Sequence, residues 1–291
     1  MAASVPSTLM ALEPGSPLDD AQAPLAGGQL HWLRAGRVEG ALAPGAGGRS
    51  AQMRYGRVGW LVGEREGRAA AIGWGCYPMV PWAGRIRRGC FSFDGKDFVL
   101  PANLGAHAIH GVGFTRPWQI GRLEVDAAML SLALPEDRYW PFGGVATQCI
   151  RVVPDGVELQ LAVQAGDKAM PAVIGWHPWF RKPDQLLFSP SAMYPRDGEG
   201  IAMLPCITPA PGPWDDCFLN RAEVTLMSEG QRLRLQADAD HWVVYDGTTY
   251  ATCVEPQTGP PDGFTLLPRR LGAGERLELR FLLGWEGDPL G

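Results

Sequence analysis

The side chains that could carry out acid–base chemistry lie in four short stretches rich in aromatic residues, proline and glycine. These stretches are residues 73–89, 107–114, 174–180 and 253–264. The first stretch places Trp82 close to Arg85, and an aromatic face beside a guanidinium fork suits a sugar ring with apolar faces and a rim of hydroxyls. Pro78 and Pro81 predict a fixed loop or a sheet edge here, because proline cannot donate to a sheet ladder. An ordinary packed loop with a surface arginine is the alternative.

Two of the stretches carry histidines. His107 and His110 have a spacing that can ligate a metal, but no cysteine, histidine or acidic residue lies nearby in the sequence. Hydrogen bonding is therefore the favoured use of these imidazoles, with a purely structural pair as the alternative. His177 lies between Trp176 and Pro178, and burial among aromatic rings favours a neutral imidazole unless a carboxylate compensates. A histidine satisfied within the core is the alternative there.

The fourth stretch contains one carboxylate in a setting suited to catalysis. Glu255 follows the strand-like run 250–254 and precedes Pro256. A carboxylate fixed at a strand end by a proline-rich loop is a reasonable general base, whereas a salt-bridged edge residue is the alternative. The sequence has no G-x-S-x-G elbow and no glycine loop with lysine that would cradle a phosphate, so serine-hydrolase and P-loop chemistry are disfavoured.

The elements that must position these stretches are predicted to be short strands. Gly contributes 38 and Pro 26 of 291 residues, too many for long helices, while 46% hydrophobic residues provide for a large core. Apolar residues alternate with polar ones over 157–163, the period of a half-buried strand. Turn residues at 154–156 and 94–95 predict two hairpins. The predicted fold class is all-β, with one large antiparallel β-sandwich.

Residues 1–28 are predicted to be a partly ordered lead-in, and residues 29–291 a single catalytic domain. The formal net charge is −5, which disfavours nucleic acid as a partner. No secretory signal or membrane span is recognisable, so no membrane partner is expected and the cytoplasm is the expected location. The six cysteines are scattered singly and are expected to be reduced, mostly buried thiols.

Taken in order, the motifs resemble those of the aldose 1-epimerase (galactose mutarotase) family. The matching segments run from Cys76 to Phe264, and residues 42–49 also resemble the early strand–turn of the family. The segments are C-Y-P-M-V-P-W-A-G-R-I-R-R-G, H-A-I-H-G-V-G-F, G-W-H-P-W-F, D-D-C-F and C-V-E-P-Q-T-G-P-P-D-G-F. The resemblance implies a supersandwich of the galactose mutarotase-like type, with an open cleft on one sheet. It also implies interconversion of the α and β anomers of a free aldose such as glucose or galactose, without metal or organic cofactor.

The resemblance assigns catalytic roles to three residues. Glu255 matches the general base, His177 the general acid, and His110 the second histidine beside the ring oxygen. Ring opening requires a base that takes the C1 hydroxyl proton and an acid that protonates O5. We therefore expect an ionised Glu255 and a protonated His177 in the resting state, with the carboxylate raising the histidine pKa.

The resemblance also implies a set of substrate-binding residues. Arg85 matches the substrate-binding arginine, and Asp215 matches the aspartate that holds sugar hydroxyls, with a possible slip to Asp216. Trp82, Trp176 and Trp179 are expected to wall the cleft. Where the family often has asparagine before the arginine this chain has Gly84, and the asparagine or serine often found near the catalytic histidine is also missing. These departures bear on which sugar is bound.

Three alternative functions remain open at this point. A hexose-6-phosphate 1-epimerase on the same fold would use Arg85, Arg87 and Arg88 to hold a phosphate. A non-catalytic carbohydrate-binding protein would keep the cleft without the chemistry. A glycoside hydrolase would need two well-placed carboxylates, for which only Glu255 and Asp215 are available. The expected partner is a small monosaccharide, and the expected state is a monomer or homodimer.

Overall fold

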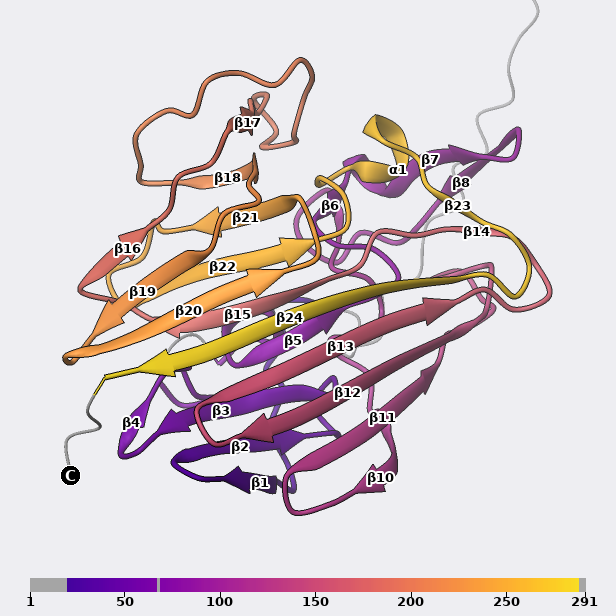
Figure 1. Ribbon diagram of the computed structural model, residues 1–291. Helices are drawn as coiled ribbons and strands as arrows, with labels where there is room; N and C mark the ends of the chain where they lie inside the picture. Colours follow the sequence, from indigo (N-terminus) through magenta and orange to yellow (C-terminus); the bar gives the residue numbers. More distant parts are fainter. Residues whose placement is uncertain (1–19, 67–68, 288–291) are drawn as a thin grey trace, which may run out of the picture.

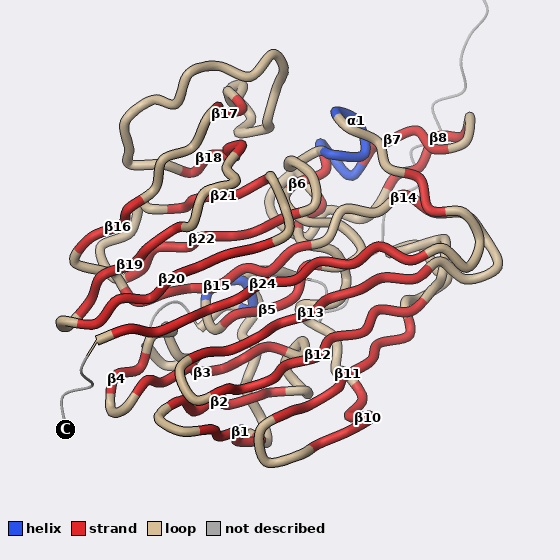
Figure 2. The backbone as a smooth tube through the Cα atoms, viewed as in Figure 1, coloured by secondary structure: helices blue, strands red, loops and turns tan. Residues whose placement is uncertain are grey.

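Two large antiparallel sheets contain most of the strands (Figures 1 and 2). The computed structural model describes residues 20–66 and 69–287, so most of the predicted lead-in, residues 1–19, lies outside the described residues. All the named strand pairs are antiparallel and the helical segments are single short turns, so the predicted all-β sandwich is confirmed. Within the described part of the chain, no helix has the length and apolar character to cross a membrane.

The first sheet is built from strands that lie far apart in the sequence. Its order is β1-β2-β3-β5-β15-β22-β21-β18-β17, with β4 paired to β3. The strands are β1 (His31–Ala35), β2 (Val38–Ala43), β3 (Arg49–Tyr55), β4 (Val58–Gly59), β5 (Cys76–Met79), β15 (Gly175–Arg181), β17 (Ala192–Tyr194), β18 (Asp215–Leu219), β21 (His241–Tyr245) and β22 (Ala251–Gln257).

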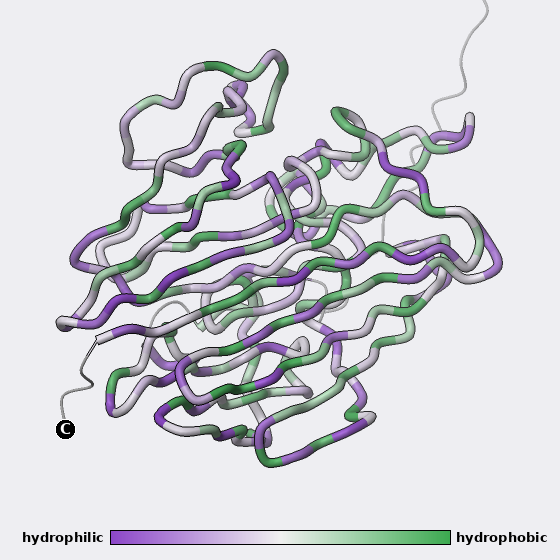
Figure 3. Tube along the Cα trace, viewed as in Figure 1, coloured by the Kyte–Doolittle hydropathy of each residue, from purple (hydrophilic) through white to green (hydrophobic). Residues whose placement is uncertain are grey.

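The second sheet has the order β10-β11-β12-β13-β24-β20-β19-β16. Its strands are β10 (Gln119–Leu123), β11 (Ala127–Ala133), β12 (Val145–Val153), β13 (Gly156–Gln164), β16 (Gln185–Leu187), β19 (Val224–Ser228), β20 (Gln231–Ala237) and β24 (Arg276–Glu286). Hydrophobic and hydrophilic residues alternate along β12, β13 and β24 (Figure 3). The predicted hairpin of β12 and β13 is confirmed, with Val153 paired to Gly156 across the turn.

The remaining short elements lie in the connections. They are the strand pairs β6 (Arg85–Ile86) with β9 (Ala108–Ile109), β7 (Cys90–Phe93) with β8 (Lys96–Val99), and β14 (Met170–Pro171) with β23 (Arg270–Leu271), together with the helix α1 (Gly263–Leu266) and the 3-10 turns at Ala71–Gly73 and Arg87–Gly89. The β7–β8 pair is the second predicted hairpin, and Asp94 and Gly95 both adopt positive φ at its turn.

The prediction that prolines exclude a central strand at residues 73–89 is wrong for β5. This strand contains Pro78 and lies between β3 and β15 in the first sheet. Its pairing with β3 is confined to Ser50 and Cys76, whereas its pairing with β15 extends over four residues. Along most of its length β5 is therefore paired on one edge only, the edge that faces β15. Pro78 is tolerated in this strand because the other edge has almost no ladder bonds for a missing N–H to remove.

The core lies between the two large sheets. It includes Trp176 and Trp242 of the first sheet, and both rings contact Phe281 of the second. All six cysteines are free, as predicted. The expectation that they are mostly buried holds for three of them, whereas Cys90 and Cys149 are exposed because they lie on outward-facing strand positions.

Candidate active site

The register of two central strands places His177 directly opposite Glu255. On β15 and β22, Gly175 pairs with Gln257 and Trp179 pairs with Cys253, so the residue midway between them on each strand faces the other. Pro178 and Pro256 flank this position, and neither has an N–H to donate across the strands. The side chains meet there, with Nε2 of His177 3.1 Å from Oε1 of Glu255.

The two-residue period of a strand decides which side chains reach this site. His177 and Trp179 project from one face of β15, while Trp176 projects from the other face and packs in the core between the sheets. The indole of Trp176 donates to Oε1 of Gln148 of β12 at 3.0 Å. The expectation that Trp176 walls the cleft is therefore wrong, because it lies one residue out of phase with His177.

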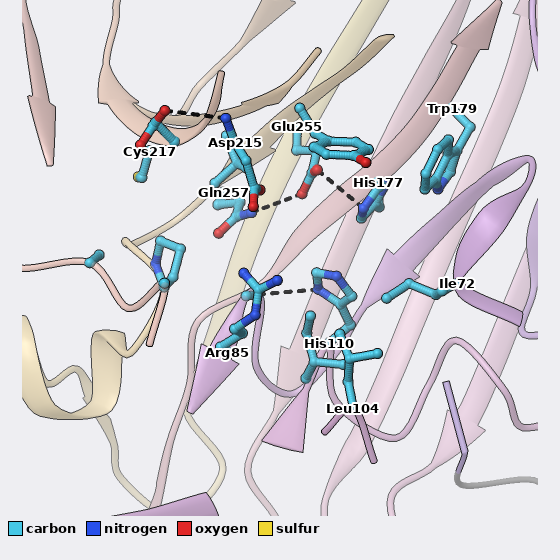
Figure 4. A pocket seen from close by; sticks show the side chains of 18 of the residues that line it. Ile72, Arg85, Leu104, His110, His177, Trp179, Asp215, Cys217, Glu255 and Gln257 are labelled. Carbon is cyan, nitrogen blue, oxygen red and sulfur yellow. Dashed lines mark hydrogen bonds and ion pairs between the residues drawn. The ribbon is translucent and has the colours of Figure 1, made fainter. Parts of the chain in front are cut away.

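The face that carries His177 and Glu255 lines a cavity of about 720 Å³. Six of the side chains assigned from the sequence line it (Figure 4), and they are Arg85, His110, His177, Trp179, Asp215 and Glu255. Asp216, the alternative to Asp215, also lines it. These residues lie in four strands (β6, β15, β18 and β22) and in the loop that follows β9. The sequence separation between them reaches 170 residues.

Trp82 does not line this cavity, so its expected place in the cleft wall is wrong. Its side chain is buried, and its ring packs against Trp140 at 5.9 Å between centroids. Trp82 follows the turn after β5, which directs it into the aromatic cluster that also includes Phe142 and Phe264. Trp82 and Arg85 are close in sequence, but Arg85 of β6 lines the cavity whereas Trp82 packs in the aromatic cluster.

The imidazole of His177 stacks with two aromatic rings. Its ring centroid lies 4.8 Å from that of Tyr77 and 5.4 Å from that of Trp179. The phenol of Tyr77 donates to the Ile72 carbonyl at 3.1 Å, which anchors that ring. The stack restricts rotation of the imidazole and keeps its Nε2 directed at Glu255.

Burial acts on the pKa values of this pair against the expected resting state. Burial lowers the pKa of His177 to about 3 and raises the pKa of Glu255 well above its ordinary value, with the nearby Asp215 carboxylate adding to the increase. The expected protonated His177 beside an ionised Glu255 is therefore not the form that burial favours. In the neutral form that burial favours, the pair carries one transferable proton, on the carboxyl group.

This shared proton predicts a broad pH optimum for any chemistry that uses the pair. A dyad that needs one proton loses activity at low pH only when His177 also becomes protonated, which its depressed pKa delays. It loses activity at high pH only when Glu255 gives up the last proton, which its raised pKa delays. We expect kcat/KM, measured by polarimetry, to stay level across neutral pH, to fall in acid only toward the depressed pKa of His177, and to fall in alkali only toward the raised pKa of Glu255. An acid limb near pH 6.5, the ordinary value for histidine, would contradict this.

His110 presents a hydrogen-bond donor to the cavity. Its Nδ1 accepts from the Gly84 N–H at 3.3 Å, which places the ring proton on Nε2 in the neutral form. Burial is the main cause that lowers the pKa of His110 well below its usual value, and the neighbouring His177 and Arg85 act in the same direction. A neutral imidazole with an Nε2–H suits a donor to a sugar oxygen.

Gly84 lies where a side chain would not fit. Its φ is +71°, and a Cβ on it would lie 2.7 Å from Cβ of Pro261. The same residue exchanges hydrogen bonds with His110, since its carbonyl accepts from the His110 N–H at 3.1 Å. The glycine therefore lets the chain pass close to the proline-rich loop 258–263 and present Arg85 beside His110.

Asp215 is tied to a residue that the sequence did not single out. Arg196, in the loop after β17, bonds to Asp215 and to Asp216, each at 2.8 Å. Burial raises the pKa of Asp215, and the charges of Arg85 and Arg196 oppose that shift. Both aspartates line the cavity, so a hydroxyl-binding role is open to either.

Other lining residues carried no signal in the sequence. Gln22 and Pro24 reach the cavity because residues 20–24 of the lead-in are bonded to residues 70–72 and to Asn103. Tyr245 and Gln257 come from β21 and β22, and each is the last residue of its strand.

One group of side chains in the cavity region could offer metal ligands. Ligand atoms of His177, Cys253 and Glu255 lie within 4.8 Å of one another. Burial raises the pKa of the Cys253 thiol well above its usual value, and a protonated thiol is a poor ligand because metals bind the thiolate. The expectation that the reaction needs no metal stays a prediction.

The fold is galactose mutarotase-like, as shown by its similarity to solved structures. A protein of Escherichia coli K12, described provisionally as an aldose 1-epimerase, superposes with a TM-score of 0.79 at 18% identity and covers 89% of this chain and 99% of that one. A GalM/aldose epimerase homologue from C. elegans has a TM-score of 0.75 at 15% identity, covering 89% and 99%. Identities this low establish the fold alone.

Sequence comparison supports the family resemblance over part of the chain. Residues 63–192 match the sequence model of the aldose 1-epimerase family, which confirms the resemblance. Arg85, His110 and His177 lie inside this range, whereas Asp215 and Glu255 lie beyond it. The uncharacterised protein YihR of Escherichia coli K12 is 33% identical over 106 residues, which are 35% of this chain and 34% of YihR. The match thus spans about a third of that relative.

Proposed function

We propose that this protein is an aldose 1-epimerase that interconverts the α and β anomers of a free aldose such as glucose or galactose. The observation that carries the proposal is the 3.1 Å contact between His177 and Glu255 inside the cavity. Ring opening needs a proton acceptor and a proton donor close together, and a buried acid–base pair that holds one proton can provide both. A cavity of about 720 Å³ is within the range of small-molecule sites.

The proposed reaction moves two protons and requires no other reactant. Glu255, as the carboxylate, takes the proton of the C1 hydroxyl, while His177 gives its proton to O5 and the C1–O5 bond breaks. The aldehyde then rotates about the C1–C2 bond and closes from its other face, and the protons return. Arg85 and the Nε2–H of His110 are suited to stabilise the sugar oxygens. Sugar binding must displace the proton from Glu255 to His177 before ring opening.

The arginine cluster supports a free sugar over a phosphorylated one. Arg87 forms ion pairs with Asp197 and Glu199, and Arg88 forms an ion pair with Glu199. Neither arginine lines the cavity. Of the three arginines considered for a phosphate, only Arg85 therefore lines the cavity. The other arginine there, Arg196, is already paired with two aspartates.

The test is the rate of anomer exchange across a panel of aldoses, followed by polarimetry. We expect acceleration with free glucose or galactose, weaker acceleration with glucose 6-phosphate in a coupled assay, and no loss after treatment with a chelator. Faster turnover of the phosphorylated sugar would favour the hexose-6-phosphate epimerase. Saturable sugar binding with no acceleration would favour a non-catalytic binding protein.

A further inference from the structure

Gln257 is a fully buried polar side chain whose amide lies beside the proposed base. It is the last residue of β22 and lines the cavity, and a dashed line in Figure 4 joins its amide to Glu255. Its Nε2 donates to Oε2 of Glu255 at 3.2 Å. Since Oε1 of Glu255 contacts His177, each oxygen of the carboxyl group has its own neighbour.

The other end of the same amide has no partner. Oε1 of Gln257 is buried and makes no hydrogen bond with any residue that the structure describes. A buried acceptor left unpaired costs free energy, so a native site seldom keeps one without a purpose. A donor that arrives with the ligand would satisfy it.

The neighbouring strand leaves space for this side chain. Gly175 pairs with Gln257 across β15 and β22, and a Cβ on Gly175 would lie 2.9 Å from Cγ of Gln257. The same Cβ would lie 2.7 Å from the Pro256 carbonyl. The absence of a side chain at Gly175 therefore leaves room for the Gln257 side chain to pack against β15.

We propose that Gln257 is a positioning and specificity-determining residue, whose Nε2 holds the Glu255 carboxylate while its Oε1 accepts a hydrogen bond from one hydroxyl of the bound sugar. This inference rests on the proposed function and adds a contact between the base and the sugar. It follows that one sugar hydroxyl is required by the enzyme, because a sugar without it leaves Oε1 unpaired.

The experiment compares Gln257→Met with the wild-type protein on glucose and on its 2-, 3-, 4- and 6-deoxy derivatives. Methionine keeps the length of the side chain and removes both polar atoms. We expect kcat/KM for glucose to fall about tenfold or more. One of the deoxy sugars lacks the hydroxyl that bonds to Oε1, so the wild-type protein gains nothing from that contact. For this sugar the ratio of wild-type kcat/KM to variant kcat/KM should be smaller than for glucose. Gln119→Met, on the exposed strand β10, is the matched control and should change nothing.

A second readout separates positioning from a merely structural role. Loss of the Nε2 donor removes a hydrogen bond that stabilises the Glu255 carboxylate, so the alkaline limb should move to higher pH. The other groups that act on Glu255 (His177 on β15, Asp215 on β18 and Arg85 on β6) are unchanged in this variant.

The outcomes separate this inference from the function on which it rests. If the wild-type protein does not accelerate anomer exchange, the proposed function fails. If the wild type is active and Gln257→Met loses the same factor on every sugar with no movement of the alkaline limb, the inference is overturned while the function stands. Retained full activity in Gln257→Met would overturn it as well.

Discussion

Replacement of Glu255 by glutamine is expected to lower the rate of anomer exchange by about 10²–10⁴-fold, because the amide cannot accept the proton of the C1 hydroxyl. The substitution keeps the shape of the side chain and removes a buried ionisable group. Folding should therefore be preserved, with an unfolding temperature equal to or above that of the wild type. Polarimetric initial rates and thermal unfolding measure the two effects.

The matched control is Glu158→Gln, at an exposed position of β13 in the other sheet. It should leave both the rate and the unfolding temperature unchanged. A Glu255→Gln protein that folds and retains full activity would remove Glu255 from the mechanism, and Asp215 and Asp216 would then be the remaining carboxylates that line the cavity.

Replacement of His177 by glutamine is expected to cause a loss of similar size. Glutamine can place an amide near Glu255 but cannot carry the proton that O5 must receive. Since both proton transfers are needed in the same ring-opening step, the double variant should be little slower than either single variant. His31→Gln, on the edge strand β1, is the control. Fully additive losses would show that the two residues act independently.

The residual activities of the two single variants should respond to pH in opposite directions. With His177 replaced, the remaining rate depends on ionised Glu255 and should rise with pH through the raised pKa of that group. With Glu255 replaced, the remaining rate depends on protonated His177 and should increase as pH falls toward its depressed pKa. Parallel pH profiles in the two variants would contradict the assignment of base and acid.

Local sequence determined the elements and the chemistry available to the site. The alternation at 157–163 and the turn residues at 154–156 and 94–95 act through backbone preferences of a few adjacent residues, so the strands and hairpins could be predicted. The residues proposed as acid and base could be named because a family resemblance pointed to His177 and Glu255 in their motifs. That Pro78 could lie inside a sheet depended on which edge of β5 is bonded, which is not local information.

The tertiary structure alone decided which of these residues meet and in which protonation state. β15 is buried on both faces, so its own sequence could not show that Trp176 packs in the core while His177 faces the cavity. The strand order β5-β15-β22 brings His177 opposite Glu255 across 78 residues of sequence, and burial there favours the neutral forms of both groups over the expected charged forms. Pairing between distant strands and removal of water are properties of the folded chain, and they also made Gln257 a neighbour of the proposed base.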